Sequence, residues 1–242
     1  MNTETVKFRI RRKWAFAGAL LPYRLCINGE AVGSLKNGKT LCVEVPKSEI
    51  YYIDDLWAGD ERNAVLRTSA SRIDIELRRA GGWKTNSYQE FYVRSHGAQV
   101  KLPSFDFSRF YTACYHDDVF SELTEAEKVL TRCLNFSQEI WDGADTILCS
   151  DKLFEMLDAL EAIGAQQYSR AFSTIIDRLF SEISLPITDE MLEDDDIMKR
   201  THQANKMARE SEKSGAAKEF HKCLVHYLIE HFCRSEQRDC WV

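Results

Sequence analysis

The sequence predicts an α+β protein in which an N-terminal antiparallel β-sandwich is followed by an all-helical C-terminal domain. Apolar residues recur at every second position in much of the first hundred residues, and at helical spacing after Pro103. The charge also changes sign. Residues 1–105 hold 17 Lys and Arg against 11 Asp and Glu, whereas residues 106–242 hold 15 against 27. We therefore expect two domains, residues 1–103 and 117–238, with different electrostatic roles.

The strands are expected where apolar and polar side chains alternate between turn residues. Residues 23–27 alternate in this way and precede Asn28-Gly29, a dipeptide that favours a two-residue hairpin turn because both positions require positive φ. A second such turn, Asn37-Gly38, separates residues 31–35 from residues 41–45. Alternation at residues 8–10, 73–77 and 91–93 predicts further strands. Six or seven short strands of this kind favour a compact antiparallel sandwich or barrel.

The helices are expected from capping residues and from apolar residues three and four positions apart. Thr124 and Glu127 form the sequence of a capping box, and the apolar pattern that follows continues to Trp141. Gly143 and Gly164 are expected to end the first two helices. Further helices are predicted over residues 166–183, over residues 188–212 and from Gly215 onward, which gives a domain of five or six helices.

Two stretches of the second half read LTEAEKVLTRCLNFSQEIWDGAD (residues 123–145) and LDALEAIGAQQYSRAF (residues 157–172). They resemble a bacterial family of helical proteins known for a DNA-mimic protein, although Asp142-Gly143-Ala144-Asp145 replaces the Asn-Gly-Gly-Phe turn of that family. The matching residues are Leu123, Thr124, Glu139, Gly143, Leu157, Leu160, Glu161, Ile163, Gly164, Ala165 and Tyr168. The resemblance implies a helical fold and, for particular members, DNA mimicry. In the first half, PYRLCINGEAVGSLKNGKTLCVEVP (residues 22–46) resembles small bacterial β-sandwich modules, which implies a role in binding or spacing.

An acidic run in the second half is the candidate binding surface. It comprises Asp189, Glu190, Glu193, Asp194, Asp195 and Asp196. On one continuous helix, Asp189, Glu193 and Asp196 would share a face. A DNA mimic needs carboxylates at phosphate-like spacing, so we expect this surface to bind a basic protein partner such as a DNA-binding regulator. The alternative is a solvated helix start that favours acidic residues because of the helix dipole.

A basic run lies at the start of the first half. If residues 8–13 form a strand, Arg9, Arg11 and Lys13 share one face and Arg12 lies on the other. Trp14 follows directly, so this face has the residue types that contact phosphates and stack on bases. Because the positive excess of this half is modest, direct nucleic-acid contact is not expected. A protein that recognises its partner through the β-domain is the alternative function.

Catalytic and cofactor sites are not expected. Nucleotide-binding, zinc-protease and serine-hydrolase motifs are absent, and the eight cysteines are scattered without a C-x-x-C pair. The residue types that bind metals are densest on the last predicted helix, but its histidines are five residues apart and cannot converge. These residues are His221, Cys223, His226, Glu230, His231 and Cys233. We therefore expect a non-enzymatic protein without metal or cofactor, with an uncharacterised hydrolase as a further alternative. The sequence shows neither a secretion signal nor an apolar run of membrane-spanning length, so a cytoplasmic location without membrane contact is expected.

Overall fold

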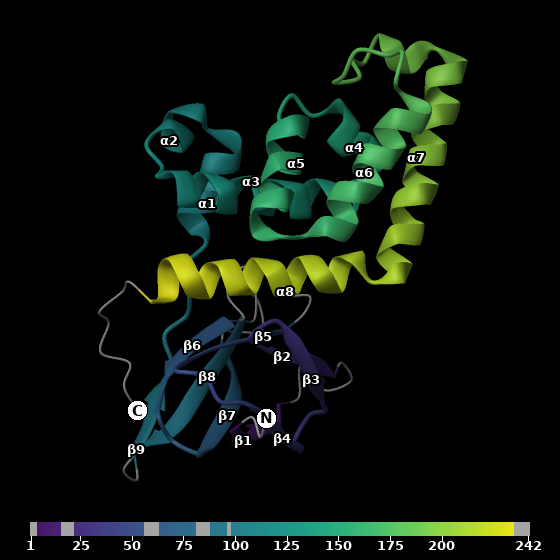
Figure 1. Ribbon diagram of the computed structural model, residues 1–242. Helices are drawn as coiled ribbons and strands as arrows, with labels where there is room; N and C mark the ends of the chain where they lie inside the picture. Colours follow the sequence, from purple (N-terminus) through teal and green to yellow (C-terminus); the bar gives the residue numbers. More distant parts are fainter. Residues whose placement is uncertain (1–3, 16–21, 56–62, 81–87, 96–97, 235–242) are drawn as a thin grey trace. The chain divides into compact units, whose positions relative to one another are not determined.

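The computed structural model describes residues 4–15, 22–55, 63–80, 88–95 and 98–234, with strands preceding helices along the chain (Figure 1). In these residues, nine strands form two sheets in the N-terminal half, and eight α-helices lie in the C-terminal half. The chain divides into two compact units. Met1–Phe107 and Leu228–Val242 form the β unit, and Ser108–Tyr227 form the helical unit. None of the helices in the described part of the chain is long and apolar enough to cross a membrane.

The β unit contains one five-stranded and one four-stranded sheet. The first has the order β4-β1-β7-β8-β9, made of β4 (Thr40–Pro46), β1 (Thr5–Arg12), β7 (Arg72–Ala80), β8 (Tyr88–Ser95) and β9 (Ala98–Lys101). The second has the order β3-β2-β5-β6, made of β3 (Glu30–Leu35), β2 (Tyr23–Ile27), β5 (Ile50–Asp55) and β6 (Asn63–Arg67). Neighbouring strands are antiparallel except for β1 and β7, which are parallel. The expectation of a wholly antiparallel fold is therefore wrong at this pair. Between these two strands the chain forms the whole second sheet and also β4 of the first, and β7 then runs in the same direction as β1.

Strand β1 shows how the alternation of the sequence builds the core of the β unit. Its side chains alternate between exposed and buried along its whole length, and Val6, Phe8 and Ile10 are almost fully buried. They belong to one apolar cluster that also includes residues of the other sheet, among them Tyr51 and Leu66. The rings of Phe8 and Tyr51 meet edge to face at 5.0 Å. Apolar side chains from both sheets thus share one core.

The helical unit confirms the predicted helix-rich domain. It contains α1 (Ser108–Tyr115), α2 (Asp117–Ser121), α3 (Glu125–Asp142), α4 (Ala144–Cys149), α5 (Leu153–Ile163), α6 (Gln166–Leu179), α7 (Asp195–Ser214) and α8 (Ala216–Leu228). Two short turns, η1 (Met191–Glu193) and η2 (Ile229–Cys233), are a 3₁₀-helix and a π-helix. Thr124 and Glu127 form the predicted capping box of α3. Gly215, in the left-handed conformation, lets α7 and α8 meet at a sharp corner (Figure 1).

Aromatic rings from three helices form the centre of the helical unit. Phe136 of α3 is fully buried and contacts Tyr168 and Phe172 of α6, with ring centroids 5.1 and 5.5 Å away. The ring of Phe220 of α8 lies 5.7 Å from Phe136. Burial of these large side chains stabilises the contact between helices that are far apart in the sequence.

The chain beyond α8 groups with the β unit, so the observed division differs from the predicted domains 1–103 and 117–238. In the β unit, the ring of Phe232 lies 5.9 Å from that of Phe105, and Arg67 donates to the carbonyl oxygen of Cys233. The sequence predicted a last helix from Gly215 onward, within a domain that extended to residue 238. In the structure α8 ends at Leu228, and the residues after it contact strand β5.

The junction between α3 and α4 depends on one side chain of α7. Gly143 has a φ of 146°, and an added Cβ there would collide with the side chains of Asp145 and Asn205. The Oδ1 of Asn205 accepts hydrogen bonds from the amides of Ala144 (2.6 Å) and Asp145 (3.3 Å), and its Nδ2 donates to Asp145 Oδ1 at 2.8 Å. Asn205 therefore supplies, from a distant helix, the cap that α4 lacks locally.

We predict that Asn205→Ala lowers the free energy of unfolding by about 1–3 kcal/mol, because it removes three hydrogen bonds and leaves amides at the start of α4 without their acceptor. Urea unfolding followed by far-ultraviolet circular dichroism measures the change. The neighbouring exposed Lys206→Ala is the control and is expected to change stability by less than about 0.5 kcal/mol. Equal free energies of unfolding for the two variants would show that Asn205 does not stabilise the junction.

Candidate functional site

The acidic residues singled out in the sequence lie in a turn, Thr188 to Asp196, that leads into α7; we call it the acidic turn. Its backbone is anchored before it begins, because the amide of Ile187 donates to the carbonyl oxygen of Leu148 at 2.9 Å. Within it, Met191 and Leu192 pack against the apolar core of the helical unit. The apolar side chains of the turn thus hold it in place while its acidic side chains are exposed.

The acidic turn is not the single helical face that the sequence suggested. Asp194 is extended, with ψ at 123°, and separates the 3₁₀ turn η1 from α7, which begins at Asp195. Because the helix is interrupted, Asp189, Glu193 and Asp196 do not follow one helical spacing. The prediction of a helix over residues 188–212 is therefore wrong in its first turns. Three consecutive aspartates each suit a helix N-cap, and Asp194 takes that place.

The six carboxylates of the acidic turn fall into two groups. Asp194 and Asp196 have structural partners: Asp194 Oδ1 accepts from the amides of Asp196 (2.7 Å) and Ile197 (3.2 Å), and Asp196 binds the Arg200 guanidinium at 2.6–2.7 Å. The side chains of the second group are exposed and form no hydrogen bond or ion pair with the described residues. This group consists of Asp189, Glu190, Glu193 and Asp195. Four of the six predicted site residues therefore remain available to a partner.

One of these carboxylates, Asp189, lies close enough to a neighbouring thiol to affect its pKa. Burial raises the pKa of Cys149, and the negative charges of Asp145 and Asp189 raise it further. The thiol of Cys149 therefore stays protonated at neutral pH, and it is no candidate nucleophile.

A polar cluster inside the helical unit was not predicted from the sequence. Arg132, Asn135 and Glu139 lie at i, i+3 and i+7 on α3, and Arg132 and Asn135 are almost fully buried. Glu139 Oε1 accepts from Asn135 Nδ2 at 2.8 Å and from Ser150 Oγ at 3.3 Å, while its Oε2 is buried without a hydrogen bond. Burial raises the pKa of Glu139, although both hydrogen bonds oppose the shift. The sequence signal that could have indicated this cluster is the helical spacing of these polar residues among apolar neighbours.

Arg132 connects this cluster to two other helices of the same unit. Its guanidinium lies 3.8 Å from the ring centroid of Phe120 in α2, and its Nη2 contacts Glu155 Oε2 in α5 at 2.5 Å. Through these two contacts, Arg132 connects α2 and α5 to α3. A buried carboxylate with a raised pKa is the property expected of a general acid or base, but the contacts of Glu139 and Arg132 are those of structural residues.

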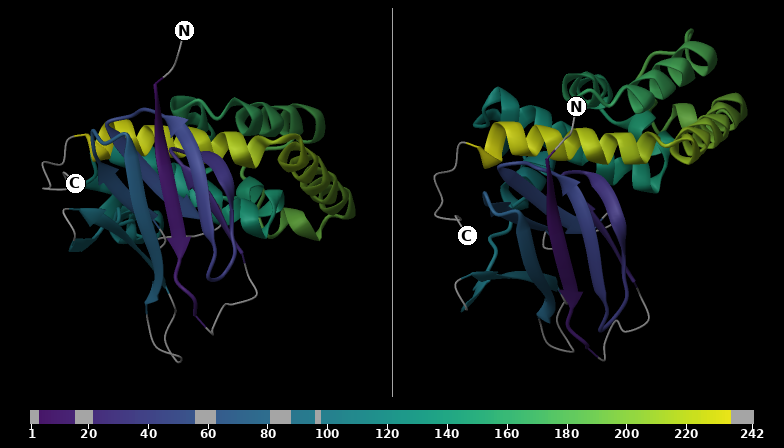
Figure 2. Two further views of the ribbon diagram at one scale, coloured as in Figure 1. Left: turned by 90° about the horizontal axis from the view of Figure 1, so that it is seen from below. Right: turned by 60° about the horizontal axis from the view of Figure 1, so that its bottom comes forward.

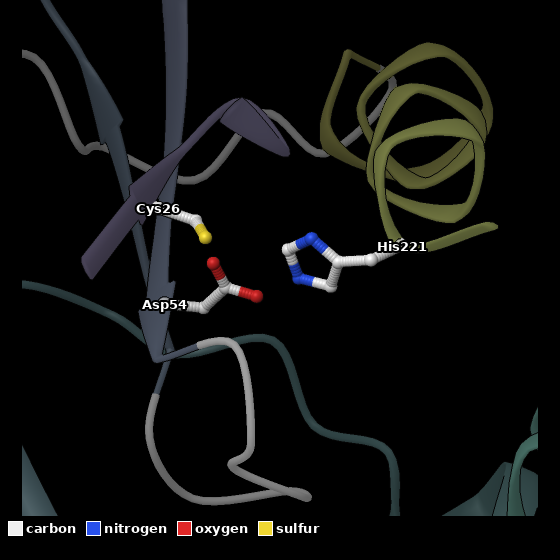
Figure 3. A group of neighbouring side chains, drawn as sticks. All are labelled: Cys26, Asp54 and His221. Atoms are coloured by element: carbon white, nitrogen blue, oxygen red, sulfur yellow. The ribbon is translucent and has the colours of Figure 1, made fainter. Parts of the chain in front are cut away.

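In the β unit, one pair of side chains combines a thiol with a carboxylate. Cys26 of β2 and Asp54 of β5 are direct cross-strand partners and point the same way (Figure 3). Burial raises the pKa of Cys26 to about 12, helped by the charges of Asp54, Asp55 and Glu30. The thiol is therefore protonated at neutral pH and is a poor nucleophile or metal ligand in this state. His221, also drawn in Figure 3, belongs to α8 of the helical unit.

The other residues of the metal-binding types on the last predicted helix are divided between two elements. Cys223 and His226 lie on α8, whereas Glu230, His231 and Cys233 lie in η2 beyond its end. The absence of a metal and of catalytic activity stays a prediction.

The basic strand β1 presents its charges as the alternation predicted. Arg9, Arg11 and Lys13 are exposed, whereas Arg12 is 4% exposed. Arg12 lies over the ring of Tyr23, 4.1 Å from its centroid. The basic run is therefore split, with three cations on the outer face of the sheet.

Comparison with models of protein families, with characterised proteins and with solved structures gives no match. The resemblance of the helical half to DNA-mimic proteins therefore stays a prediction.

Glu139 gives a prediction about pH. Its folded-state pKa lies above its usual value, so the folded state holds this proton more tightly than the unfolded chain does. Stability is thus unaffected at pH values below the usual pKa and falls as pH rises through the folded-state pKa. Glu139→Gln cannot lose a proton, so its free energy of unfolding is expected to fall less between mildly acidic pH and pH ~8. Urea unfolding across this range measures the difference.

The exposed Glu122→Gln is the control for this experiment, and its pH profile is expected to follow that of the unchanged protein. If the Glu139→Gln profile also runs parallel to that of the unchanged protein, the carboxyl of Glu139 is not perturbed by burial.

Proposed function

We propose that this chain is a non-catalytic binding protein whose acidic turn binds a basic partner protein. The observation that carries the proposal is the availability of Asp189, Glu190, Glu193 and Asp195, which are exposed and without a side-chain partner among the described residues. A binding surface of charged residues works best when its backbone is already ordered, because binding then costs less conformational entropy.

The order of the acidic turn supports this proposal. Thr188 Oγ1 accepts from the amide of Met191 at 3.4 Å, and the carbonyl oxygen of Thr188 accepts from the amide of Leu192 at 3.2 Å. Asp194 then caps α7. Thr188 and Asp194 thus fix the main chain of the turn. The side chains of the four carboxylates named above take no part in this.

The partner we propose is a DNA-binding protein, and the mode of binding is mimicry of the phosphate backbone. Closely spaced carboxylates on an ordered surface attract the Lys and Arg clusters that otherwise contact phosphates. The helical half has a large excess of acidic residues, which favours encounter with a basic surface. Lys199 and Arg200 follow on α7, but Arg200 is engaged by Asp196 and by the carbonyl oxygen of Leu179.

For the β unit, we infer that its two sheets pack as a sandwich. One apolar cluster includes Phe8 and Ile10 of the five-stranded sheet together with Leu25, Ile53 and Leu66 of the four-stranded sheet. A sandwich of this kind presents an outer sheet face that is free to take part in recognition, which is the alternative site of binding.

The test removes four charges from the acidic turn without touching its structural carboxylates. The variant carries Asp189→Asn, Glu190→Gln, Glu193→Gln and Asp195→Asn. Proteins retained from a lysate of the source cells by the immobilised chain are identified by mass spectrometry at low and moderate salt. A DNA-binding protein is expected among them, with retention that falls with salt and with added duplex DNA. The variant is expected to retain it at least about tenfold less.

The matched control removes the same charge elsewhere on the helical unit, through Glu122→Gln, Asp158→Asn, Asp177→Asn and Glu210→Gln, all at exposed positions. It is expected to retain the partner like the unchanged chain. Equal losses in both variants would mean that only net charge matters. Retention that duplex DNA does not reduce would remove the mimicry from the proposal and leave an acidic protein-binding site.

A further inference from the structure

The outer face of β1 carries a row of cations at regular spacing. Arg9 and Arg11 lie two residues apart on the exposed side of the strand, and Lys13 continues the row beyond its end. Side chains on one face of a strand repeat at roughly 6.7 Å, so the three charges form a line. Figure 2 shows β1 (purple) within its sheet, where β4 and β7 flank it in the strand order.

An exposed indole lies at the end of this row. Trp14 is 66% exposed, and its ring borders Gly38, where an added Cβ would lie 3.5 Å from the indole. The hairpin turn that holds Gly38 also contributes two exposed cations, Lys36 and Lys39. Five cations and one exposed aromatic ring are thus gathered around one end of β1. We call these residues the basic face: Arg9, Arg11, Lys13, Trp14, Lys36 and Lys39.

The backbone around Trp14 is held in place by one asparagine. Asn37 Oδ1 accepts from the amide of Ala15 at 3.1 Å, and Asn37 Nδ2 donates to the carbonyl oxygen of the same residue at 2.8 Å. The amide of Arg12 donates to the carbonyl oxygen of Lys39 at 2.9 Å. The indole and the lysines of the turn are therefore presented by one connected piece of backbone.

Two carboxylates of β7 lie beside the basic face, and both have other cationic partners. Asp74 is the register partner of Arg9 and lies 3.9 Å from Arg72. Glu76 is the register partner of Arg11 and binds Arg78 at 2.6 Å. Each acid thus has a basic partner on its own strand, and Glu76 also interacts with the charge of Lys13. The five cations of the basic face outnumber these two acids, so an excess of positive charge remains.

We propose that the basic face binds single-stranded nucleic acid, with the row of Arg9, Arg11 and Lys13 along the phosphates and Trp14 stacked on a base. Proteins that bind single strands without sequence preference combine a line of positive charge with an aromatic ring, because every base offers a π-face. The carboxylates of an acidic protein would pair with the cations equally well, but such a partner would not explain the exposed indole of Trp14. A duplex keeps its bases stacked inside, so it also leaves Trp14 unused.

The test is fluorescence anisotropy of the full chain with labelled single-stranded DNA and RNA of roughly 12 nucleotides, and with a duplex of the same length. Single strands are expected to bind more tightly than the duplex, with affinity that falls as salt rises. Trp14→Ala is expected to weaken binding about tenfold through the lost stacking. The double variant Arg9→Glu, Arg11→Glu is expected to reduce the affinity by at least about a hundredfold, because it reverses two charges of the row.

Matched controls are available on the helical unit. Trp141 is 72% exposed, and Trp141→Ala is expected to leave binding unchanged. The pair Lys206→Glu, Lys213→Glu makes the same change of net charge at exposed positions and is expected to have little effect. The four-residue variant of the acidic turn is also expected to bind oligonucleotides normally, so this proposal and the proposed function fail separately.

Far-ultraviolet circular dichroism establishes that each variant is folded. The double variant Lys36→Glu, Lys39→Glu tests the basic face without altering β1. Four results overturn the proposal. These are no binding of single strands at low salt, tighter binding of the duplex, displacement of the oligonucleotide by polyaspartate at equal charge concentration, and unchanged affinity of Trp14→Ala. The third and fourth results would identify a surface for acidic proteins instead.

Discussion

Strand β1 hydrogen-bonds to β4 on one side and to β7 on the other, and its register with both neighbours constrains the rest of the β unit. Because side chains alternate strictly along a strand, a slip of one residue would expose Phe8 and Ile10 and bury Arg9 and Arg11. The same pairing therefore builds the core and the basic face. Burial of a large apolar side chain stabilises by about 1.5–3 kcal/mol, so the core fixes the register and the charges follow from it.

The helical unit meets a different constraint, since several of its polar groups lie inside it. Asn135 and Arg132 of α3 contact Met156 and Glu155 of α5, respectively. Asn205 caps a helix that begins 61 residues earlier in the chain. Such contacts specify which helices meet, because each has only one arrangement that supplies its partner. In the acidic turn, Asp194 and Asp196 have structural partners, whereas Asp189, Glu190, Glu193 and Asp195 form no side-chain hydrogen bond or ion pair with the described residues. One short segment therefore combines acids that hold the structure with acids that have no such role.

Local chemistry made part of the fold predictable. Asn28 and Gly29 have φ values of 52° and 77°, as the hairpin signal required, and the capping box at Thr124 is formed. Strand β5 was missed because all six of its residues are buried, which removes the alternation that identifies a strand. The short helices α1, α2 and α4 were missed as well, since few residues carry a periodic signal over so short a length.

The candidate site was predictable in its composition but not in its geometry. The sequence identified the acidic run, yet the choice of Asp194 as the cap over its two neighbours depends on where the chain must turn to pack Ile187 and Leu192. The partners of Arg132 could not be predicted from the sequence for the same reason, because tertiary contacts with Phe120 and Glu155 supply them.

The β unit is discontinuous in sequence, since Phe232 and Cys233 rejoin it after the whole helical unit has been traversed. During synthesis on the ribosome, the strands described above emerge well before these last contributors to their unit. Phe105 can meet Phe232 only after 127 more residues (232 − 105) have been translated, which at roughly 5–20 residues per second takes several seconds or more. Completion of the β unit is thus coupled in time to the emergence of the helices.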